Sequence, residues 1–267
     1  MTETIPYWHV DAFASAPFCG NQAAVMVLEQ WLDDEVLQKI GEENNFAETA
    51  FVVRDETGKA DWELRWFTPT DEVALCGHAT LASGHVLLRR DGGERVTFRT
   101  RKAGILEVVR KDDAYELALP LTRVEPSSQP ELLAALGFRG ETFLSYEGAE
   151  QTAIILLKNE SEVRALDPDM TALGKIDLMA ICTAPGDECD VVSRVFVPAW
   201  GVPEDSVTGS AHAALAPFWV DRLGKAEMTA HQASRRGGDL VMRVEEDRVW
   251  LGGPCVTVVE GGFYLTG

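Results

Sequence analysis

The chain is poor in basic residues and in cysteine. Its 267 residues include 24 Lys and Arg against 43 Asp and Glu, which gives a net charge of −19 at pH 7. A field of that sign repels nucleic acid and anionic lipid, so neither is an expected partner. The five cysteines form no CxxC pair and no zinc-ligand spacing. This pattern argues against a disulfide framework and favours reduced thiols.

Long hydrophobic runs and nucleotide-binding loops are also missing. No stretch approaches 18 consecutive apolar residues, so no membrane span is expected. The first residues, Met1 to Pro6, lack the basic and apolar regions of a secretory signal. The sequence contains no P-loop and no GxGxxG motif after a strand. These absences predict a cytoplasmic protein and give no sign of a bound nucleotide.

The sequence does contain an internal repeat. A strand-like segment that begins at Arg65 leads to Cys76-Gly77-His78-Ala79, and a similar segment that begins at Arg194 leads to Thr208-Gly209-Ser210-Ala211. The offset between the two copies is 129 residues at Phe67 and Phe196, 132 at Gly77 and Gly209, and 134 at Pro120 and Pro254. A slowly drifting offset is typical of a duplication with small insertions in the loops.

Each copy predicts a mixed α/β domain. Alternating apolar residues indicate strands near 7–10 and 49–53, and a helix is expected over 33–43. In the second half, Asp167-Pro168 is expected to open a short helix, and Pro217 is expected to shorten or kink a longer one. The linker-like segment 126–130 separates the copies. We therefore expect domains at 1–124 and 125–267, with a C-terminal end that can cross back to the first domain.

The two copies place equivalent loops before their small-residue helices. The first turn of a helix has free N–H groups and a positive dipole end, which together bind anions. Gly77 and Gly209 allow a ligand to approach the backbone closely, and Ser210 follows the second glycine. If the copies are related by pseudo-symmetry, both helix ends face one cleft that binds a carboxylate. Each loop taken alone is equally an ordinary helix start.

Glu48 is the candidate acid–base. It precedes Thr49-Ala50-Phe51-Val52, and strand alternation places it on the same face as Ala50 and Val52. A carboxylate on an apolar face is desolvated, which suits it to take and return protons near neutral pH. The spacing is equally compatible with an edge residue whose carboxylate lies in water.

Three further polar residues lie near these loops. Asp205 precedes the second helix start, where an N-cap or an Asx turn is the simpler interpretation. His78 can donate to a substrate carbonyl, although a single histidine at a helix start is more often structural. Asn21 follows Gly20 in another turn of the glycine-polar type.

The sequence resembles the PhzF-like phenazine-biosynthesis family, within the diaminopimelate-epimerase-like superfamily. The resemblance extends from residue 10 to residue 210, and the segments taken together are specific. The matching segments are Val10-Asp11-Ala12-Phe13, Phe18-Cys19-Gly20-Asn21-Gln22-Ala23-Ala24-Val25, Asn45-Phe46-Ala47-Glu48-Thr49-Ala50-Phe51, Phe67-Thr68-Pro69, Cys76-Gly77-His78-Ala79-Thr80 and Pro203-Glu204-Asp205-Ser206-Val207-Thr208-Gly209-Ser210. The sequence departs from the family pattern at Phe18-Cys19 and at Pro217.

This resemblance implies two pseudo-symmetric domains, each a sheet wrapped around a central helix, in a homodimer. It implies an isomerase that shifts a proton in a small carboxylate metabolite without a metal or another cofactor. Glu48 then takes and returns the proton, and His78 and Asp205 polarise and orient the substrate. The substrate-binding residues that it implies are Asn21, Gly77, Gly209 and Ser210.

Two alternatives remain at this point. A cofactor-independent amino-acid epimerase or racemase of this superfamily uses two thiols, one in each domain. Cys76 occupies one of those positions, but its repeat partner is Thr208, which cannot act as a thiol base. The other alternative is a non-catalytic member that binds a carboxylate metabolite or another protein.

Overall fold

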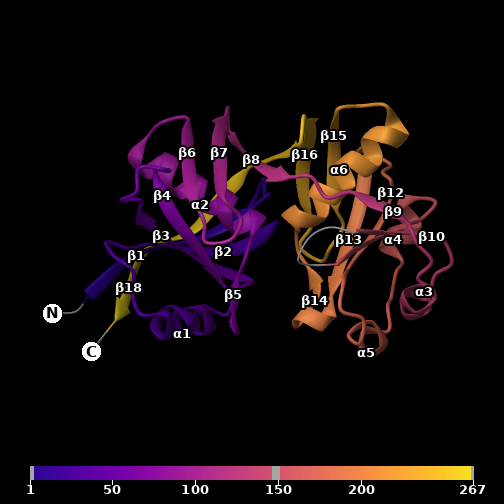
Figure 1. The fold of residues 1–267 in the computed structure, drawn as a ribbon, viewed down its shortest axis with the longest axis horizontal. Helices are drawn as coiled ribbons and strands as arrows, with labels where there is room; N and C mark the ends of the chain where they lie inside the picture. Colours follow the sequence, from indigo (N-terminus) through magenta and orange to yellow (C-terminus); the bar gives the residue numbers. More distant parts are fainter. Residues whose placement is uncertain (1–2, 146–150, 266–267) are drawn as a thin grey trace. The chain divides into compact units, whose positions relative to one another are not determined.

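The structure is a computed structural model that describes residues 3–145 and 151–265 (Figure 1). The chain forms two compact units. One contains the residues up to Ala118 together with those from Gly252 onward, and the other contains Leu119–Leu251. Within the described ranges, no helix has the length and apolar character needed to cross a membrane.

The first unit is a sheet that surrounds helix α2 (Gly77–Asp91). Twelve consecutive residues of α2, from Gly77 to Leu88, are buried, which is typical of a helix enclosed on all sides. At Gly84 an added Cβ would lie 2.4 Å from Val108 Cγ1, so only glycine fits where the helix approaches the sheet. The surrounding strands are β1 (Glu3–Ala12), β2 (Asn21–Val27), β3 (Glu48–Arg54), β4 (Trp62–Phe67), β5 (Glu72–Val73), β6 (Arg95–Arg99), β7 (Ile105–Lys111), β8 (Ala114–Pro120) and β18 (Cys255–Leu265).

Helix α1 (Asp34–Asn44) corresponds to the helix expected over 33–43. Its apolar residues Leu37 and Ile40 pack in one cluster with Phe51 and Val53 of β3. Because side chains alternate along a strand, the even-numbered residues of β3 face the other way, toward α2. This alternation places Glu48 on the face of the sheet that the central helix covers.

The second unit repeats this topology around helix α6 (Gly209–Leu223). Its core combines apolar residues of the strands and of short helices. Its strands are β9 (Val124–Pro126), β10 (Glu141–Ser145), β11 (Thr152–Leu156), β12 (Met179–Pro185), β13 (Val191–Val197), β14 (Val202–Asp205), β15 (Glu227–Gln232), β16 (Gly238–Glu245) and β17 (Arg248–Gly253). Shorter helical segments are α3 (Pro130–Leu136), α4 (Glu160–Arg164), α5 (Met170–Leu173) and the 3-10 turn η1 (Pro198–Trp200).

The pairing order confirms the duplication. In the first unit β2 is parallel to β3, β3 is antiparallel to β4, β4 is antiparallel to β5 and parallel to β6, and β6 is antiparallel to β7. The same relations hold for β11, β12, β13, β14, β15 and β16 in the second unit. Both central helices contain 15 residues. The expected class, two pseudo-symmetric α/β units that each wrap a central helix, is therefore confirmed.

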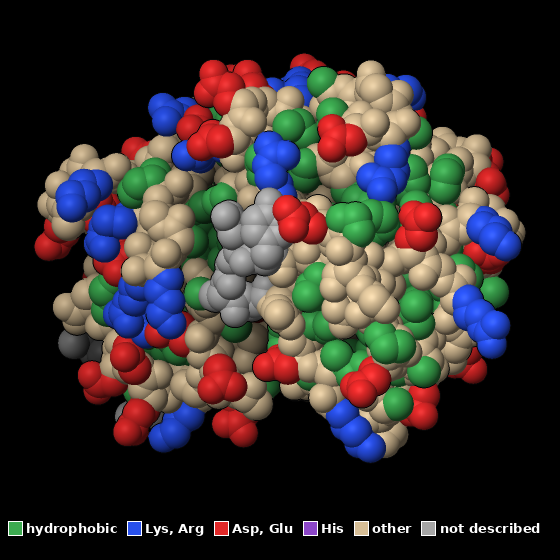
Figure 2. All heavy atoms as spheres, turned by 45° about the vertical axis from the view of Figure 1, so that its right-hand side comes forward, with side chains coloured by type: hydrophobic (Ala, Val, Ile, Leu, Met, Phe, Trp, Pro, Cys, Tyr) green, Lys and Arg blue, Asp and Glu red, His purple; other side chains and the backbone are tan. Residues whose placement is uncertain are grey.

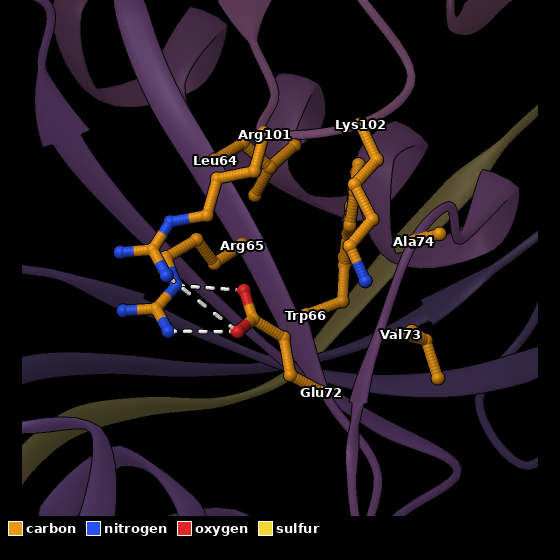
Figure 3. A pocket seen from close by; sticks show the side chains of 8 residues that line it. All are labelled: Leu64, Arg65, Trp66, Glu72, Val73, Ala74, Arg101 and Lys102. Atoms are coloured by element: carbon orange, nitrogen blue, oxygen red, sulfur yellow. Dashed lines mark hydrogen bonds and ion pairs between the residues drawn. The ribbon is translucent and has the colours of Figure 1, made fainter.

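An arginine–glutamate pair also recurs in both units. Arg65 of β4 donates two hydrogen bonds of 2.8 Å to Glu72 of β5, and Figure 3 shows this pair on the wall of a small pocket. At the equivalent place in the second unit, Arg194 of β13 donates bonds of 2.7 and 3.0 Å to Glu204 of β14. Each pair links the strand that precedes the central helix to its short partner strand.

Two helix predictions require correction. Helix α6 runs through Pro217 without being shortened. The carbonyl of Ala213, which loses its helical donor at Pro217, accepts a hydrogen bond of 3.2 Å from the backbone N–H of Thr122. The short helix expected at Asp167-Pro168 is α5, which begins later, at Met170. It begins there because the Asp169 side chain caps it by accepting from the N–H groups of Thr171 and Ala172.

Acidic and basic side chains are interspersed on the face shown in Figure 2. The excess negative charge of −19 is therefore not gathered there into one patch of a single sign. The five cysteines are free thiols in the structure.

His212 of α6 provides a test of the core of the second unit. Its side chain is buried, and burial lowers its pKa to about 4. In the unfolded chain the His212 imidazole is protonated below about pH 6.5, whereas in the folded chain it is protonated only near pH 4. The free energy of unfolding therefore falls as the pH is lowered from about 6.5 toward 4. His212→Asn is expected to differ less from the parent at pH 5 than at pH 7, as measured by urea unfolding. An unchanged difference between the two pH values would contradict this expectation.

Candidate acid–base site

Glu48 begins β3 and lies beside the second residue of α2. Its Oε2 atom is 3.0 Å from Nε2 of His78, and its side chain keeps 18% of its surface exposed. Among the described residues, the buried Oε2 atom has no well-aligned hydrogen bond. The carboxylate therefore lies next to a histidine, is partly exposed to solvent, and can accept a further hydrogen bond.

His78 is held from its other side by Asn21, the first residue of β2. The Asn21 Nδ2 atom lies 3.1 Å from Nδ1 of the imidazole, and both side chains are buried. A neutral ring accepts this contact at Nδ1 and carries its proton on Nε2, which faces Glu48, whereas the Nδ1–H of an imidazolium donates to the Asn21 amide oxygen after the amide turns over. Asn21 thus orients the histidine toward the carboxylate.

Cys76 lies immediately before α2 in contact with the same histidine. Its Sγ atom is 3.6 Å from Nδ1 and 4.0 Å from Nε2 of His78. Burial raises the pKa of the Cys76 thiol to about 11, and the nearby Glu48 carboxylate adds to the effect. Cys76 is therefore a neutral thiol at neutral pH, although it occupies a helix N-terminus, where thiolates are often stabilised.

The charge state of His78 is set by competing effects. Burial lowers the pKa of the imidazole, but interactions with Cys76 and Glu48 raise it, and the net result is well above the ordinary value. The raised pKa favours the protonated form of His78, whose Nε2 atom lies 3.0 Å from Oε2 of Glu48.

Asp205 lies in the second unit, at the end of β14. Its Oδ2 atom accepts a hydrogen bond of 2.6 Å from the Thr208 hydroxyl, and its Oδ1 atom accepts one of 2.8 Å from the N–H of Ser206. Both contacts are local, but Asp205 is not the N-cap that the sequence suggested, because Thr208 occupies that position of α6. Thr208 stands at the repeat position of Cys76, and its hydroxyl donates to the Asp205 carboxylate.

Gln232 was missed by sequence reasoning. It ends β15 with its side chain fully buried. Its amide nitrogen donates to the Asp205 carbonyl at 2.8 Å, and its amide oxygen accepts from the Thr208 N–H at the same distance. Gln232 therefore fixes the loop that leads into α6. No sequence motif distinguishes a single glutamine in a strand, so this role could not be predicted from the sequence.

The seven predicted site residues thus fall into two groups. Asn21, Glu48, Gly77 and His78 lie together in the first unit, where Gly77 is the first residue of α2. Asp205, Gly209 and Ser210 lie at the start of α6 in the second unit. The expected cleft shared by both helix ends stays a prediction, as does the homodimer.

The first group also has the donor atoms of a metal site. Donor atoms of Glu48, Cys76 and His78 all lie within 4.8 Å of one another. The sequence predicted no metal, because Glu48 is remote from the other two along the chain and no ligand spacing is visible.

Two repeated units, each a sheet around a buried central helix, define the class of diaminopimelate-epimerase-like folds. The chain belongs to the phenazine biosynthesis-like protein family, whose PhzC–PhzF model matches residues 10–261. An uncharacterized isomerase of Pseudomonas aeruginosa is 47% identical over 266 residues, which cover 98% of this chain and 99% of the relative. The resemblance read from the sequence motifs is therefore confirmed.

Solved structures agree with this assignment. The crystal structure of a PhzF-family phenazine biosynthesis protein from Enterococcus faecalis has a TM-score of 0.90 and 43% identity, covering 98% of this chain and 100% of that one. A predicted epimerase from Pseudomonas aeruginosa has a TM-score of 0.75 at 21% identity, covering 98% and 100%, and this likeness shows the fold alone.

Proposed function

We propose that the protein is a cofactor-independent isomerase that moves a proton within a small carboxylate metabolite. Glu48 is the group that removes the proton from one carbon and returns it to another. The observation that carries this proposal is the Glu48–His78 contact of 3.0 Å, with a buried carboxylate oxygen that has no well-aligned hydrogen bond. Relatives named as uncharacterized isomerases support the reaction class.

The chemistry follows from the charges in the first unit. The carboxylate of Glu48 accepts a proton from a carbon next to an electron-withdrawing group, and negative charge then develops on the substrate. The imidazolium of His78 stabilises that charge, and Asn21 holds the ring in place. Protonated Glu48 then returns the proton to a different carbon, so a double bond shifts and the composition of the substrate is unchanged.

Substrate binding is assigned to helix ends and to Asp205. The N-terminus of α2 at Gly77 offers backbone N–H groups and a positive dipole to a carboxylate. We assign the same role in the second unit to Gly209 and Ser210 at the start of α6. Asp205, which is oriented by Thr208 and Gln232, is proposed to orient the substrate.

The experiment that tests this function is a search for proton exchange in D₂O. A panel of small cyclic and acyclic unsaturated or amino carboxylates is incubated with the protein, and exchange at carbon is followed by NMR. Exchange accompanied by a new positional isomer supports the proposal. A racemised product without a positional isomer would instead support an epimerase, and no exchange across the panel would favour a non-catalytic binder.

Cys76 separates the isomerase from the two-thiol epimerase. Its pKa of about 11 and the presence of Thr208 at the repeat position leave that mechanism without two thiol bases. Cys76→Ser is therefore expected to lose less than about tenfold in kcat/KM, well below the ~10²–10⁴-fold that general acid–base catalysis supplies. A loss of several orders of magnitude in the exchange assay would restore the epimerase interpretation.

A further inference from the structure

We propose that Glu48, Cys76 and His78 form a binding site for Zn²⁺, and that the bound ion blocks the proton-transfer site. The binding part of the proposal stands on the geometry of the first unit alone. The blocking part rests on the proposed isomerase function.

The three donor atoms already form a compact triangle. Nε2 of His78 is 3.0 Å from Oε2 of Glu48 and 4.0 Å from Sγ of Cys76, and all donor atoms lie within 4.8 Å of one another. In a tetrahedral zinc site, with Zn–S of about 2.3 Å and Zn–N or Zn–O of about 2.0–2.2 Å, neighbouring ligand atoms are about 3.3–3.6 Å apart. Small side-chain rotations therefore suffice to reach ligand geometry.

The donor set suits zinc better than a hard cation. One sulfur, one nitrogen and one oxygen match the ligands of Zn²⁺, whereas Mg²⁺ and Ca²⁺ prefer oxygen alone. Three protein ligands leave a fourth position open, as in zinc sites that exchange a ligand. The Asn21 side chain lies 3.1 Å from Nδ1 of His78, and with its amide oxygen turned toward the ring it would accept the Nδ1–H of a metal-bound imidazole.

Charge and proton balance are also satisfied. Cys76 binds zinc as a thiolate, so its thiol proton passes to solvent. The Glu48 carboxylate supplies the second negative charge, and His78 binds as a neutral ring after releasing its extra proton. The two anionic ligands then neutralise the dication inside a largely buried site.

Zinc occupancy and proton transfer exclude each other. The ion would occupy the oxygen of Glu48 that takes the proton and the nitrogen of His78 that stabilises substrate charge. Zinc is therefore expected to inhibit the isomerase reversibly, and a chelator is expected to restore the activity.

Cobalt(II) substitution tests the binding without any substrate. Titration of the full-length protein with Co²⁺ under reducing conditions is expected to give a sulfur-to-cobalt charge-transfer band that saturates at one equivalent, and Zn²⁺ is expected to abolish the band by displacement. No such band in the parent would overturn the proposal, whatever the outcome of the activity screen.

Three variants locate the ion. Cys76→Ser is expected to lose the charge-transfer band, whereas the matched control Cys189→Ser is expected to keep it. His78→Asn keeps the thiol and is expected to weaken Zn²⁺ binding by more than the ~10–100-fold cost of changing an outer-shell partner. Circular dichroism establishes that each variant is folded. A band that persists in folded Cys76→Ser, or unchanged zinc affinity in His78→Asn, would overturn the site.

Discussion

Glu48→Gln is expected to slow substrate proton exchange by ~10²–10⁴-fold, the usual contribution of general acid–base catalysis. Glutamine preserves the shape of the side chain and can still contact His78, but it cannot accept a proton and return it. The helix ends that are proposed to bind the carboxylate are unchanged, so substrate affinity should fall far less than kcat. This split between kcat and affinity identifies Glu48 as the group that moves the proton.

The measurement uses the active substrate found in the D₂O panel, with exchange at carbon followed by NMR in the presence of a chelator. Glu43→Gln is the matched control, because this substitution makes the same chemical change at an exposed position of α1. It should exchange substrate at the parental rate. If Glu48→Gln exchanges as fast as the parent, the acid–base is another residue, with Asp205 and His78 as the next candidates.

Glu72→Gln is expected to destabilise the protein by about 3 kcal/mol, the order of cost when a buried ion pair loses one partner. The Arg65 side chain is only 1% exposed, and Glu72 accepts both of the 2.8 Å bonds drawn in Figure 3. The remaining partner, Asp34, is 69% exposed and therefore compensates the charge poorly. Neutral glutamine would leave the buried guanidinium without its main counter-charge.

Glu204→Gln provides a comparison within the same molecule. Arg194, the repeat equivalent of Arg65, is 14% exposed and also donates to the backbone carbonyls of Val163, Arg164 and Leu166. Glu204→Gln is therefore expected to lower the free energy of unfolding by less, about 1–2 kcal/mol, because Arg194 keeps those hydrogen bonds and its contact with solvent. Urea unfolding at pH 7 measures both variants. An equal or larger loss for Glu204→Gln would contradict the argument from burial.

The proposed zinc site changes how such activity measurements should be read. Trace zinc would lower the activity of the parent and would have less effect on a variant that lacks a ligand. The chelator in the exchange assay therefore separates loss of the acid–base from relief of inhibition.

The sequence by itself determined the repeat, the family and most of the candidate residues. The drifting offset between the copies predicted two similar units, because a duplicated pattern of strands and small-residue helix must bury the same faces twice. Period-two alternation placed Glu48 on the same face as Ala50 and Val52, but it left open whether that face is covered. These are local properties of the chain, so they can be read from neighbouring residues alone.

The tertiary structure alone decided which residues meet. Asn21 and His78 are 57 positions apart, and only the packing of α2 against β2 brings the amide to the imidazole. The neutral state of Cys76 depends on burial, and the role of Gln232 depends on the closing of β15 near the start of α6. Even the uninterrupted helix at Pro217 depends on a donor that the distant Thr122 supplies. Such contacts follow from how the elements pack together, which no local pattern in the sequence encodes.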